Sequence, residues 1–337
     1  MSEEAMTLLC TRLCPWLEAP FGRLEAARRA DRLGSAWLIS GPPGIGKLNL
    51  ALALAARLLG VADEHPPALG PADASAAMRE RRVPADHHPD LHLVFPEPEK
   101  RTIGIEQIRE LSEALSMKGF RGGAKAAVIE PAEAMTLAAA NALLKTLEEP
   151  AAQTFLLLVS HQPHRLLPTI RSRCQVLAVA PPSEQEVAAW LGVPQGHPVL
   201  SLAGRAPLPG AALIQPEKIR FLEELGEKFE ELCQDRRDPR ALAEEWVKQD
   251  LELALQWLIG RLEGAIRGRF TRAPDSNAIT PKGGDPLHNA WRSLSVRALF
   301  ERLDAARRLL DRLGSGINVE LALHALLVGF RPQRGRS

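Results

Sequence analysis

The chain has 337 residues, of which 45% are apolar and 25% charged, and its formal net charge at neutral pH is +1. This length allows two or three domains, and the composition is that of an ordinary globular protein. A net charge so close to zero excludes a strong overall field for nucleic acid. The first residues carry Glu3 and Glu4 without a basic segment, and no run reaches the ~18 to 20 apolar residues that span a bilayer. We therefore expect a cytoplasmic protein without a signal peptide or membrane span.

The first predicted elements are a helix, a strand and a second helix. Apolar residues at helical spacing up to Leu33 predict a helix that ends at Gly34. The apolar run 36–40 is too short for a helix and leads directly into glycines, so it predicts a buried strand. Residues 47–59 are rich in Ala and Leu and predict a helix that Gly60 terminates.

Between this strand and this helix lies a glycine-rich loop. Residues 41–47 read Gly-Pro-Pro-Gly-Ile-Gly-Lys, which matches the Gly-x-x-x-x-Gly-Lys pattern of a phosphate-binding loop, and the flanking strand and helix are the context that pattern requires. The candidate nucleotide-binding residues are Gly41, Gly44, Gly46 and Lys47. The next residue should be Ser or Thr, whose hydroxyl holds Mg²⁺, but it is Leu48, and an isobutyl group cannot coordinate a metal.

The next part of the chain alternates strands and helices after one irregular stretch. Residues 61–88 contain several prolines and few large apolar residues, and they predict a surface insertion with one short helix at 74–82. The five predicted strands are 36–40, 91–95, 126–130, 154–160 and 174–179. Amphipathic helices separate them, including one that Thr136 is expected to cap and a short one at 164–171. This alternation predicts a parallel sheet covered by helices on both faces.

Strand signals stop after Pro181-Pro182, and the rest of the chain predicts helices. Ser183 is expected to cap a small helix, and a Gly/Pro-rich stretch follows. Long helical segments begin at Pro216 and include residues 251–266 and 294–313. The predicted fold class is α/β plus all-α, divided into an α/β domain at 1–179, a small helical lid at 180–214 and a helical domain at 215–337.

The predicted nucleotide site lacks groups that hydrolysis needs. A phosphate-binding-loop ATPase holds Mg²⁺ partly through an Asp at a strand end and positions the attacking water with a further polar residue. Here the strand that should supply these groups ends in Glu130, and Pro131 follows. Glu130 could hold a metal through a water molecule, although its longer side chain displaces the carboxylate, and Pro131 has no carboxylate at all. Together with Leu48, these residues predict no intrinsic ATPase activity, although weak ATP or ADP binding stays open.

One longer motif identifies a family. Residues 141–150 read Asn-Ala-Leu-Leu-Lys-Thr-Leu-Glu-Glu-Pro and are followed by Ser172-Arg173-Cys174. This combination resembles the AAA+ clamp-loader subunits of bacterial DNA polymerase III, and residues 15–17, 88–90 and 316–318 support the match. The resemblance implies an AAA+ domain with a five-stranded parallel sheet, a small helical lid and a C-terminal helical collar for oligomerisation.

Within this family, the motor subunits (gamma/tau) keep the Ser/Thr and the Asp-Glu, and the delta-prime subunits lose them. Leu48, Glu130 and Pro131 therefore place the chain with delta-prime. The resemblance implies a stator that helps load the sliding clamp onto primed DNA in replication. Its partners would be gamma/tau and delta subunits, the sliding clamp, the DNA polymerase III holoenzyme and, through the complex, primer–template DNA. The holoenzyme is a DNA-directed DNA polymerase, a nucleotidyltransferase, but the chain shows no polymerase carboxylate pair of its own.

The same resemblance assigns the one candidate catalytic residue. The arginine of the family's Ser-Arg-Cys motif maps onto Arg173, which would act in trans as an arginine finger at the ATP site of a neighbouring motor subunit. The residues alone favour a different interpretation, in which Arg173 caps the preceding helix. Ser160 lies where the family has a polar sensor residue, but a capping or buried hydroxyl is an equal alternative.

The family resemblance suggests a zinc ion, but this sequence lacks the cysteines that would bind it. The family usually carries four cysteines after the loop helix, but no cysteine lies between Cys14 and Cys174. We therefore predict no metal site and no required cofactor. The alternative function is an active gamma/tau-type ATPase with unusual metal coordination, which would turn over ATP alone.

Overall fold

The computed structural model describes residues 11–61, 65–74, 88–97, 100–195, 197, 199–203, 206–270, 294–313 and 318–331. Contacts divide the chain into two compact units. The first contains Met1–Val193 and Ala203–Ala212, and the second contains Pro194–Leu202 and Leu213–Ser337. The predicted boundaries after 179 and 214 stay predictions. The helix predicted at 74–82 falls almost entirely outside the described residues.

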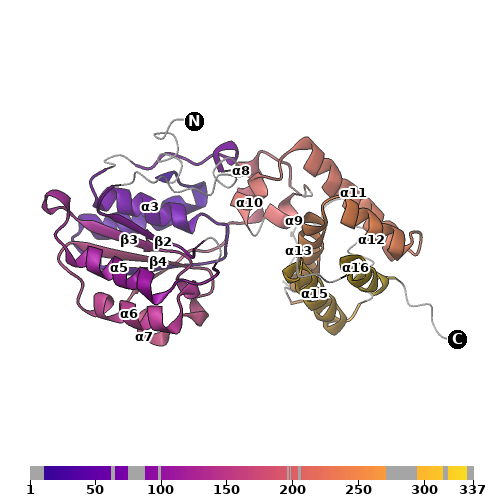
Figure 1. The fold of residues 1–337 in the computed structure, drawn as a ribbon. Coiled ribbons are helices and arrows are strands. Elements are labelled where there is room, and N and C mark those ends of the chain that lie inside the picture. The colour runs from indigo at the N-terminus through magenta and orange to yellow at the C-terminus, as the bar shows by residue number, and fades with distance from the viewer. Residues whose placement is uncertain are drawn as a thin grey trace. The chain divides into compact units, whose positions relative to one another are not determined.

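The first unit is built on a five-stranded parallel sheet in the order β2-β3-β4-β1-β5 (Figure 1). Its strands are β1 (Ala36–Ser40), β2 (Leu91–Val94), β3 (Lys125–Ile129), β4 (Thr154–Ser160) and β5 (Gln175–Ala178). All five predicted strands are confirmed. β1 lies between β4 and β5, and the register aligns its last residue, Ser40, with Ser160 of β4 and Ala178 of β5.

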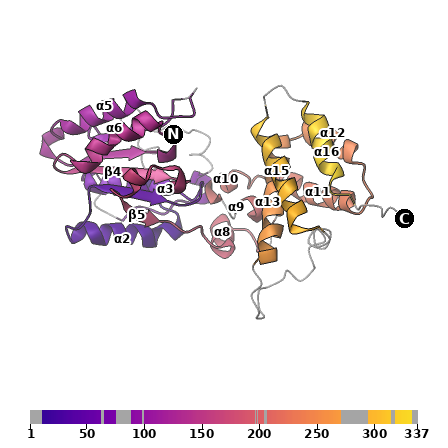
Figure 2. The ribbon, with the colours of Figure 1, turned by 90° about the horizontal axis from the view of Figure 1, so that it is seen from below.

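Helices cover both faces of this sheet, because its strands are apolar on both sides. α5 (Ile105–Ser116) and α6 (Leu137–Glu148) pack on one face, against Leu38, Ile129 and Leu158. The opposite face is covered by α2 (Glu18–Arg29) and α3 (Lys47–Leu58) (Figures 1 and 2). The fold class predicted for this unit is confirmed.

Local capping follows the sequence closely. The Thr136 Oγ1 accepts a hydrogen bond from the Ala139 N–H at 3.2 Å and begins α6. Ser183 and Glu186 form a capping box at the start of α8 (Glu184–Leu191), in which the Glu186 carboxylate accepts the Ser183 N–H at 2.7 Å. Both predicted caps are confirmed, since each side-chain oxygen satisfies an N–H that the helix leaves free.

Two predicted helix bounds are wrong. α2 ends at Arg29 and not at Gly34, because Asp31 adopts a left-handed φ of 54° and Arg32 donates its N–H back to the Ala27 carbonyl at 2.9 Å. The segment 164–171 forms two short helices, η4 (Pro163–Arg165) and α7 (Pro168–Arg171). Pro168 favours this break because the residue before a proline avoids helical geometry.

The described residues also contain five further short helical elements. They are η1 (Pro15–Leu17), η2 (Phe120–Gly122), η3 (Ala132–Ala134), α9 (Leu200–Ala203) and α10 (Pro207–Ala211). Within the described residues, no helix has both the length and the apolar character needed to cross a membrane.

The second unit is helical, as its sequence predicts. Its helices are α11 (Pro216–Cys233), α12 (Pro239–Lys248), α13 (Leu251–Phe270), α15 (Val296–Asp311) and α16 (Val319–Val328). An aromatic cluster forms its centre: the ring of Phe229 lies 5.6 Å from that of Trp257 and 5.0 Å from that of Phe330, centroid to centroid. Trp246 stacks on the same Phe229 ring at 6.3 Å. Such edge and offset contacts are favourable aromatic geometries.

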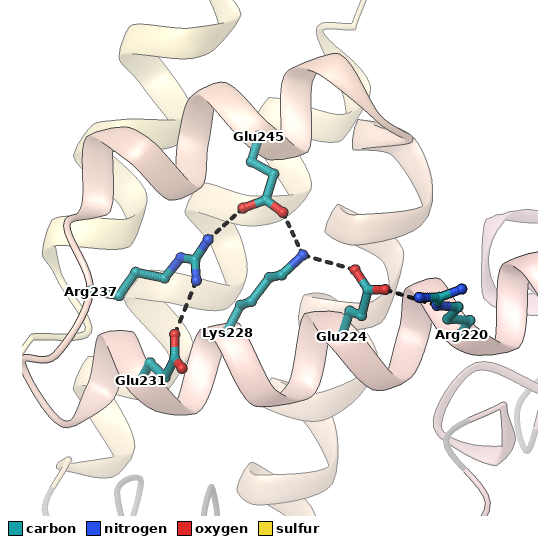
Figure 3. A network of polar contacts seen from close by, with 6 residues as sticks. All are labelled: Arg220, Glu224, Lys228, Glu231, Arg237 and Glu245. Carbon is teal, nitrogen blue, oxygen red and sulfur yellow. Dashed lines mark hydrogen bonds and ion pairs between the residues drawn. The ribbon is translucent and has the colours of Figure 1, made fainter.

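A chain of charges joins α11 to α12 on the outside of this core (Figure 3). Glu245 is its centre, because its carboxylate lies 2.5 Å from the Lys228 Nζ and 2.6 Å from an Arg237 nitrogen. The hydrogen bond to Glu245 raises the pKa of Lys228. The chain continues to Glu224 and Glu231, 2.9 Å and 3.0 Å from the respective cations. The two helices are thus joined by charged contacts as well as by apolar packing.

Candidate nucleotide loop and arginine finger

The glycine loop has the backbone shape of a phosphate-binding loop. Gly44 and Gly46 adopt left-handed φ values of 72° and 87°, which other residues rarely tolerate. A Cβ added to Gly44 would lie 2.6 Å from the Cβ of Ala206, and one added to Gly46 would lie 2.9 Å from a methyl of Leu17. The loop therefore needs glycine for its conformation and also for the close approach of its neighbours.

These neighbours come from the same chain and bond the loop directly. The Leu208 N–H of α10 donates to the Gly44 carbonyl at 3.1 Å. On another side, the Trp16 Nε1–H donates to the Ile45 carbonyl at 2.9 Å. Ile45 is fully buried. The loop is consequently held by contacts to two segments distant in the sequence, η1 and α10.

Lys47, the residue that would reach phosphate, is directed to the loop itself. Its Nζ donates to the Pro42 carbonyl at 2.5 Å, and the residue is only 2% exposed. Burial lowers the pKa of Lys47 to about 8, although the nearby carboxylates of Glu130 and Glu133 act in the opposite direction. The ammonium group therefore already has a carbonyl partner and two anionic neighbours.

Glu133 is a member of this site that the sequence interpretation missed. η3 follows β3 and places the Glu133 carboxylate beside the end of β4, where Oε1 accepts the backbone N–H groups of His161 and Gln162 at 2.9 and 3.0 Å. Burial acts to raise the pKa of Glu133, but the hydrogen bonds from its own backbone N–H and from the His161 N–H contribute to a net lowering. The sequence signal that could have identified Glu133 was its position, three residues after Glu130 at the strand end.

The same edge of the sheet carries Glu130 and His161. The His161 Nε2 lies 3.8 Å from a Glu130 carboxylate oxygen. Burial and the positive charge of Lys47 lower the pKa of His161, while Glu133 raises it. Glu130, which the sequence placed at the strand end, is therefore in the site, and Ser160 is a fully buried residue at its base.

These groups do not fit a magnesium-bound nucleotide. Leu48 offers no oxygen at the position where the Ser or Thr hydroxyl of an active loop holds Mg²⁺. Ala206 and Leu208 already contact the glycine that should approach the phosphate. Among the described residues, no three His, Cys, Asp or Glu side chains are arranged to hold a metal ion. The absence of zinc and of a required nucleotide stays a prediction, since the insertion is only partly described.

Arg173 lies at the opposite end of the strands. It lies two residues before β5, whose Gln175 pairs with Trp37 near the start of β1, whereas the glycine loop follows Ser40 at the end of β1. At ~3.3 Å per residue, the three steps from Trp37 to Ser40 alone separate these two levels of the sheet by about 10 Å. The Arg173 side chain is 35% exposed, and its Nη1 donates to the Thr169 carbonyl at 3.0 Å. The helix-capping contact expected from the residues alone is therefore present.

Comparison with known proteins identifies the family. A family model described as DNA polymerase III, delta subunit, matches residues 17–183. The DNA polymerase III subunit delta' of Escherichia coli (strain K12) is 33% identical over 327 residues, which cover 94% of this chain and 95% of that relative. The chain belongs to the family of DNA polymerase III delta-prime subunits. The delta' subunit of Pseudomonas aeruginosa is 36% identical and covers 93% of this chain and 96% of its own length.

Membership assigns the chain to the clamp-loader proteins of DNA replication and to the AAA+ class, as the sequence motifs predicted. Among solved structures, a DNA polymerase III gamma-subunit-related protein of Thermotoga maritima aligns over 91% of this chain and 98% of its own, with 22% identity and a TM-score of 0.45. Membership of the delta-prime family and the observed parallel sheet agree with the fold expected from residues 141–150 and 172–174.

Proposed function

We propose that this delta-prime subunit is a stator that hydrolyses no ATP itself and supplies Arg173 in trans to the ATP site of a neighbouring motor subunit. The placement of Arg173 carries the proposal. Because it lies at the end of the strands opposite to the chain's own glycine loop, Arg173 cannot serve a nucleotide held by that loop. It remains partly exposed and able to meet another molecule.

The chain's own loop supports the non-hydrolysing half of the proposal. Catalysis would require Lys47 to leave the Pro42 carbonyl, α10 to leave Gly44, and a metal ligand to replace the Leu48 side chain. Each change has its own energetic cost, and no single rearrangement supplies all three. The loop is better explained as a packed support for η1 and α10.

The chemistry of the finger follows from the guanidinium group. Arginine stays charged at every physiological pH, and its planar N–H groups can contact two phosphate oxygens together. At a neighbour's ATP site, Arg173 would stabilise the negative charge that spreads over the transferring phosphoryl group. The rest of this chain would hold that cation at a fixed position.

The proposed partners are the gamma/tau and delta subunits, the sliding clamp and, through the complex, primer–template DNA. The second unit would supply the collar contact between subunits. Three large apolar side chains of α15 and α16 are exposed there: Phe300, Leu321 and Val328. Exposed apolar side chains of this size are candidates for burial between subunits.

Reconstitution of the loader with Arg173→Ala tests the proposal. We expect assembly by size-exclusion chromatography to be unchanged and clamp-stimulated ATPase activity to fall, because a finger contributes on the order of 10³-fold or more at its own site. Arg173→Lys should recover little, since it keeps the charge and loses the planar fork. Arg171→Ala, which removes an exposed arginine from the neighbouring α7, is the matched control. Normal ATPase activity with Arg173→Ala would disprove the finger assignment.

The active-motor alternative makes the opposite prediction for the isolated chain. A gamma/tau-type ATPase would turn over ATP without partners and lose that activity in Lys47→Ala. The stator proposal expects no turnover by the isolated wild-type chain above that of Lys47→Ala. A measurable difference between these two proteins would overturn the non-hydrolysing assignment.

A further inference from the structure

The Arg173 guanidinium is held by a second partner besides the Thr169 carbonyl. A carboxylate oxygen of Glu148 lies 2.5 Å from Nη2, while Nη1 donates to Thr169 at 3.0 Å. Glu148 is the last residue of α6, and Thr169 belongs to α7. Two acceptors from two different helices therefore contact the two terminal nitrogens of one guanidinium.

This arrangement restricts the direction of the cation. A guanidinium carries five N–H donors in one plane, and fixing both terminal nitrogens defines that plane. Two donors are used, so others stay available for phosphate. The α6 end of the pair is well anchored, because α6 packs through the fully buried Leu143 and the nearly buried Leu147 against the sheet core.

We propose that Glu148 is a positioning residue for the finger: it orients the Arg173 guanidinium toward the neighbouring subunit's nucleotide. This inference rests on the proposed function of Arg173 and adds a residue to it. Glu148 does not touch the nucleotide; it lowers the number of orientations that Arg173 must lose when the phosphate binds. Misplacement of a catalytic group by ~1 Å can reduce a rate by about 100-fold, so loss of this support is measurable.

The test uses the reconstituted loader with motor subunits whose own Ser-Arg-Cys arginine is replaced by alanine, so that the finger-dependent turnover comes from the site facing this chain. In this loader, Glu148→Ala should lower the single-turnover ATP hydrolysis rate about tenfold and leave the KM for ATP within about twofold. Glu148→Gln keeps an acceptor oxygen and should recover most of the rate. The matched control is Glu149→Ala, which removes the adjacent exposed carboxylate.

A double-mutant cycle separates this inference from the proposed function. If Arg173→Ala alone has no effect, the finger assignment fails. If Arg173→Ala lowers the rate and Glu148→Ala behaves like Glu149→Ala or raises the rate, the finger stands and the positioning role fails. The positioning role requires that Glu148→Ala adds no further loss in the Arg173→Ala background. An additive loss would show that Glu148 acts independently of Arg173 and would overturn the inference.

Discussion

A cationic side chain lies near each end of the parallel strands, but the two have opposite surroundings. At one end Lys47 is 2% exposed, bonded to its own loop and flanked by carboxylates. At the other end the Arg173 side chain is 35% exposed, and its guanidinium lies against Glu148 and the Thr169 carbonyl. One cation is part of the packing of this chain, whereas the other lies partly exposed at its surface. If Arg173 acts in trans as proposed, the difference shows how a nucleotide-binding fold can keep its shape while its chemistry is supplied elsewhere.

The largest expected effect comes from filling the space at the glycine loop. Gly44→Ala should lower the free energy of unfolding by about 3 kcal/mol, because it combines a left-handed backbone with a contact of 2.6 Å to the Ala206 Cβ. Gly60→Ala is the matched control, since Gly60 has a similar φ of 70° with open space around it. It should cost only about 1 kcal/mol.

Urea unfolding of the two variants measures this difference. Equal losses in Gly44→Ala and Gly60→Ala would mean that α10 does not pack on the loop as described. In that case, close packing would no longer distinguish the end of the sheet at the glycine loop from the end at Arg173.

The next effect is a pH dependence that belongs to Lys47. Burial lowers its pKa from 10.5 to about 8, so between these values the unfolded chain binds more protons than the folded chain. The contribution of Lys47 to stability therefore rises with pH in this range, by about 2 kcal/mol between pH 8 and pH 10. The buried thiols of Cys14 and Cys174, whose pKa values are raised, act in the opposite direction in both proteins, so the prediction concerns the difference between them. In urea unfolding, the free energy of unfolding of wild type relative to Lys47→Met should increase by this amount from pH 8 to pH 10. A parallel pH response in the two proteins would place the Lys47 ammonium in solvent.

A smaller effect is expected from nucleotide. If the loop binds Mg-ATP with a Kd of about 1 mM or weaker, 1 mM ligand stabilises the chain by no more than about 0.4 kcal/mol. Thermal unfolding with and without Mg-ATP measures this, and Lys47→Ala shows how much depends on the loop. If Mg-ATP stabilised the wild type by several kcal/mol and did not stabilise Lys47→Ala, the glycine loop would be a working nucleotide site.

The smallest effect is expected at Arg173. Because Arg173 and Glu148 are both partly exposed, Arg173→Ala should change the free energy of unfolding of the isolated chain by only about 0.3 kcal/mol. Denaturant unfolding should therefore barely distinguish it from wild type, even though the reconstituted loader loses ATPase activity. A loss above about 2 kcal/mol would make Arg173 a structural residue of this chain.

Local patterns predicted most of the first unit because they act through neighbouring residues. The apolar run of β4 and the Thr136 cap of α6 are present with the predicted bounds and partner type. The end of α2 was misjudged because Asp31 takes a left-handed conformation that apolar spacing does not report.

The site shows the same division between local and long-range information. Gly41 to Lys47 and Glu130 were found from motifs, which are short stretches of sequence. Glu133 was missed because it enters the site through η3 and contacts His161 and Gln162, 28 and 29 residues later. The cover of α10 over Gly44 depends on a contact across more than 160 residues, which one sequence does not reveal.

The indole of Trp16 makes the glycine loop observable by tryptophan fluorescence and circular dichroism. Its Nε1–H is bonded to the Ile45 carbonyl, and its ring lies 5.2 Å from that of Trp190 in an edge-to-face pair. The Trp190 Nε1–H in turn bonds the Leu69 carbonyl at 2.7 Å. Two coupled chromophores therefore connect the glycine loop, the insertion and α8. Their emission and near-ultraviolet dichroism should report any movement of the loop, without a label, while the complex forms.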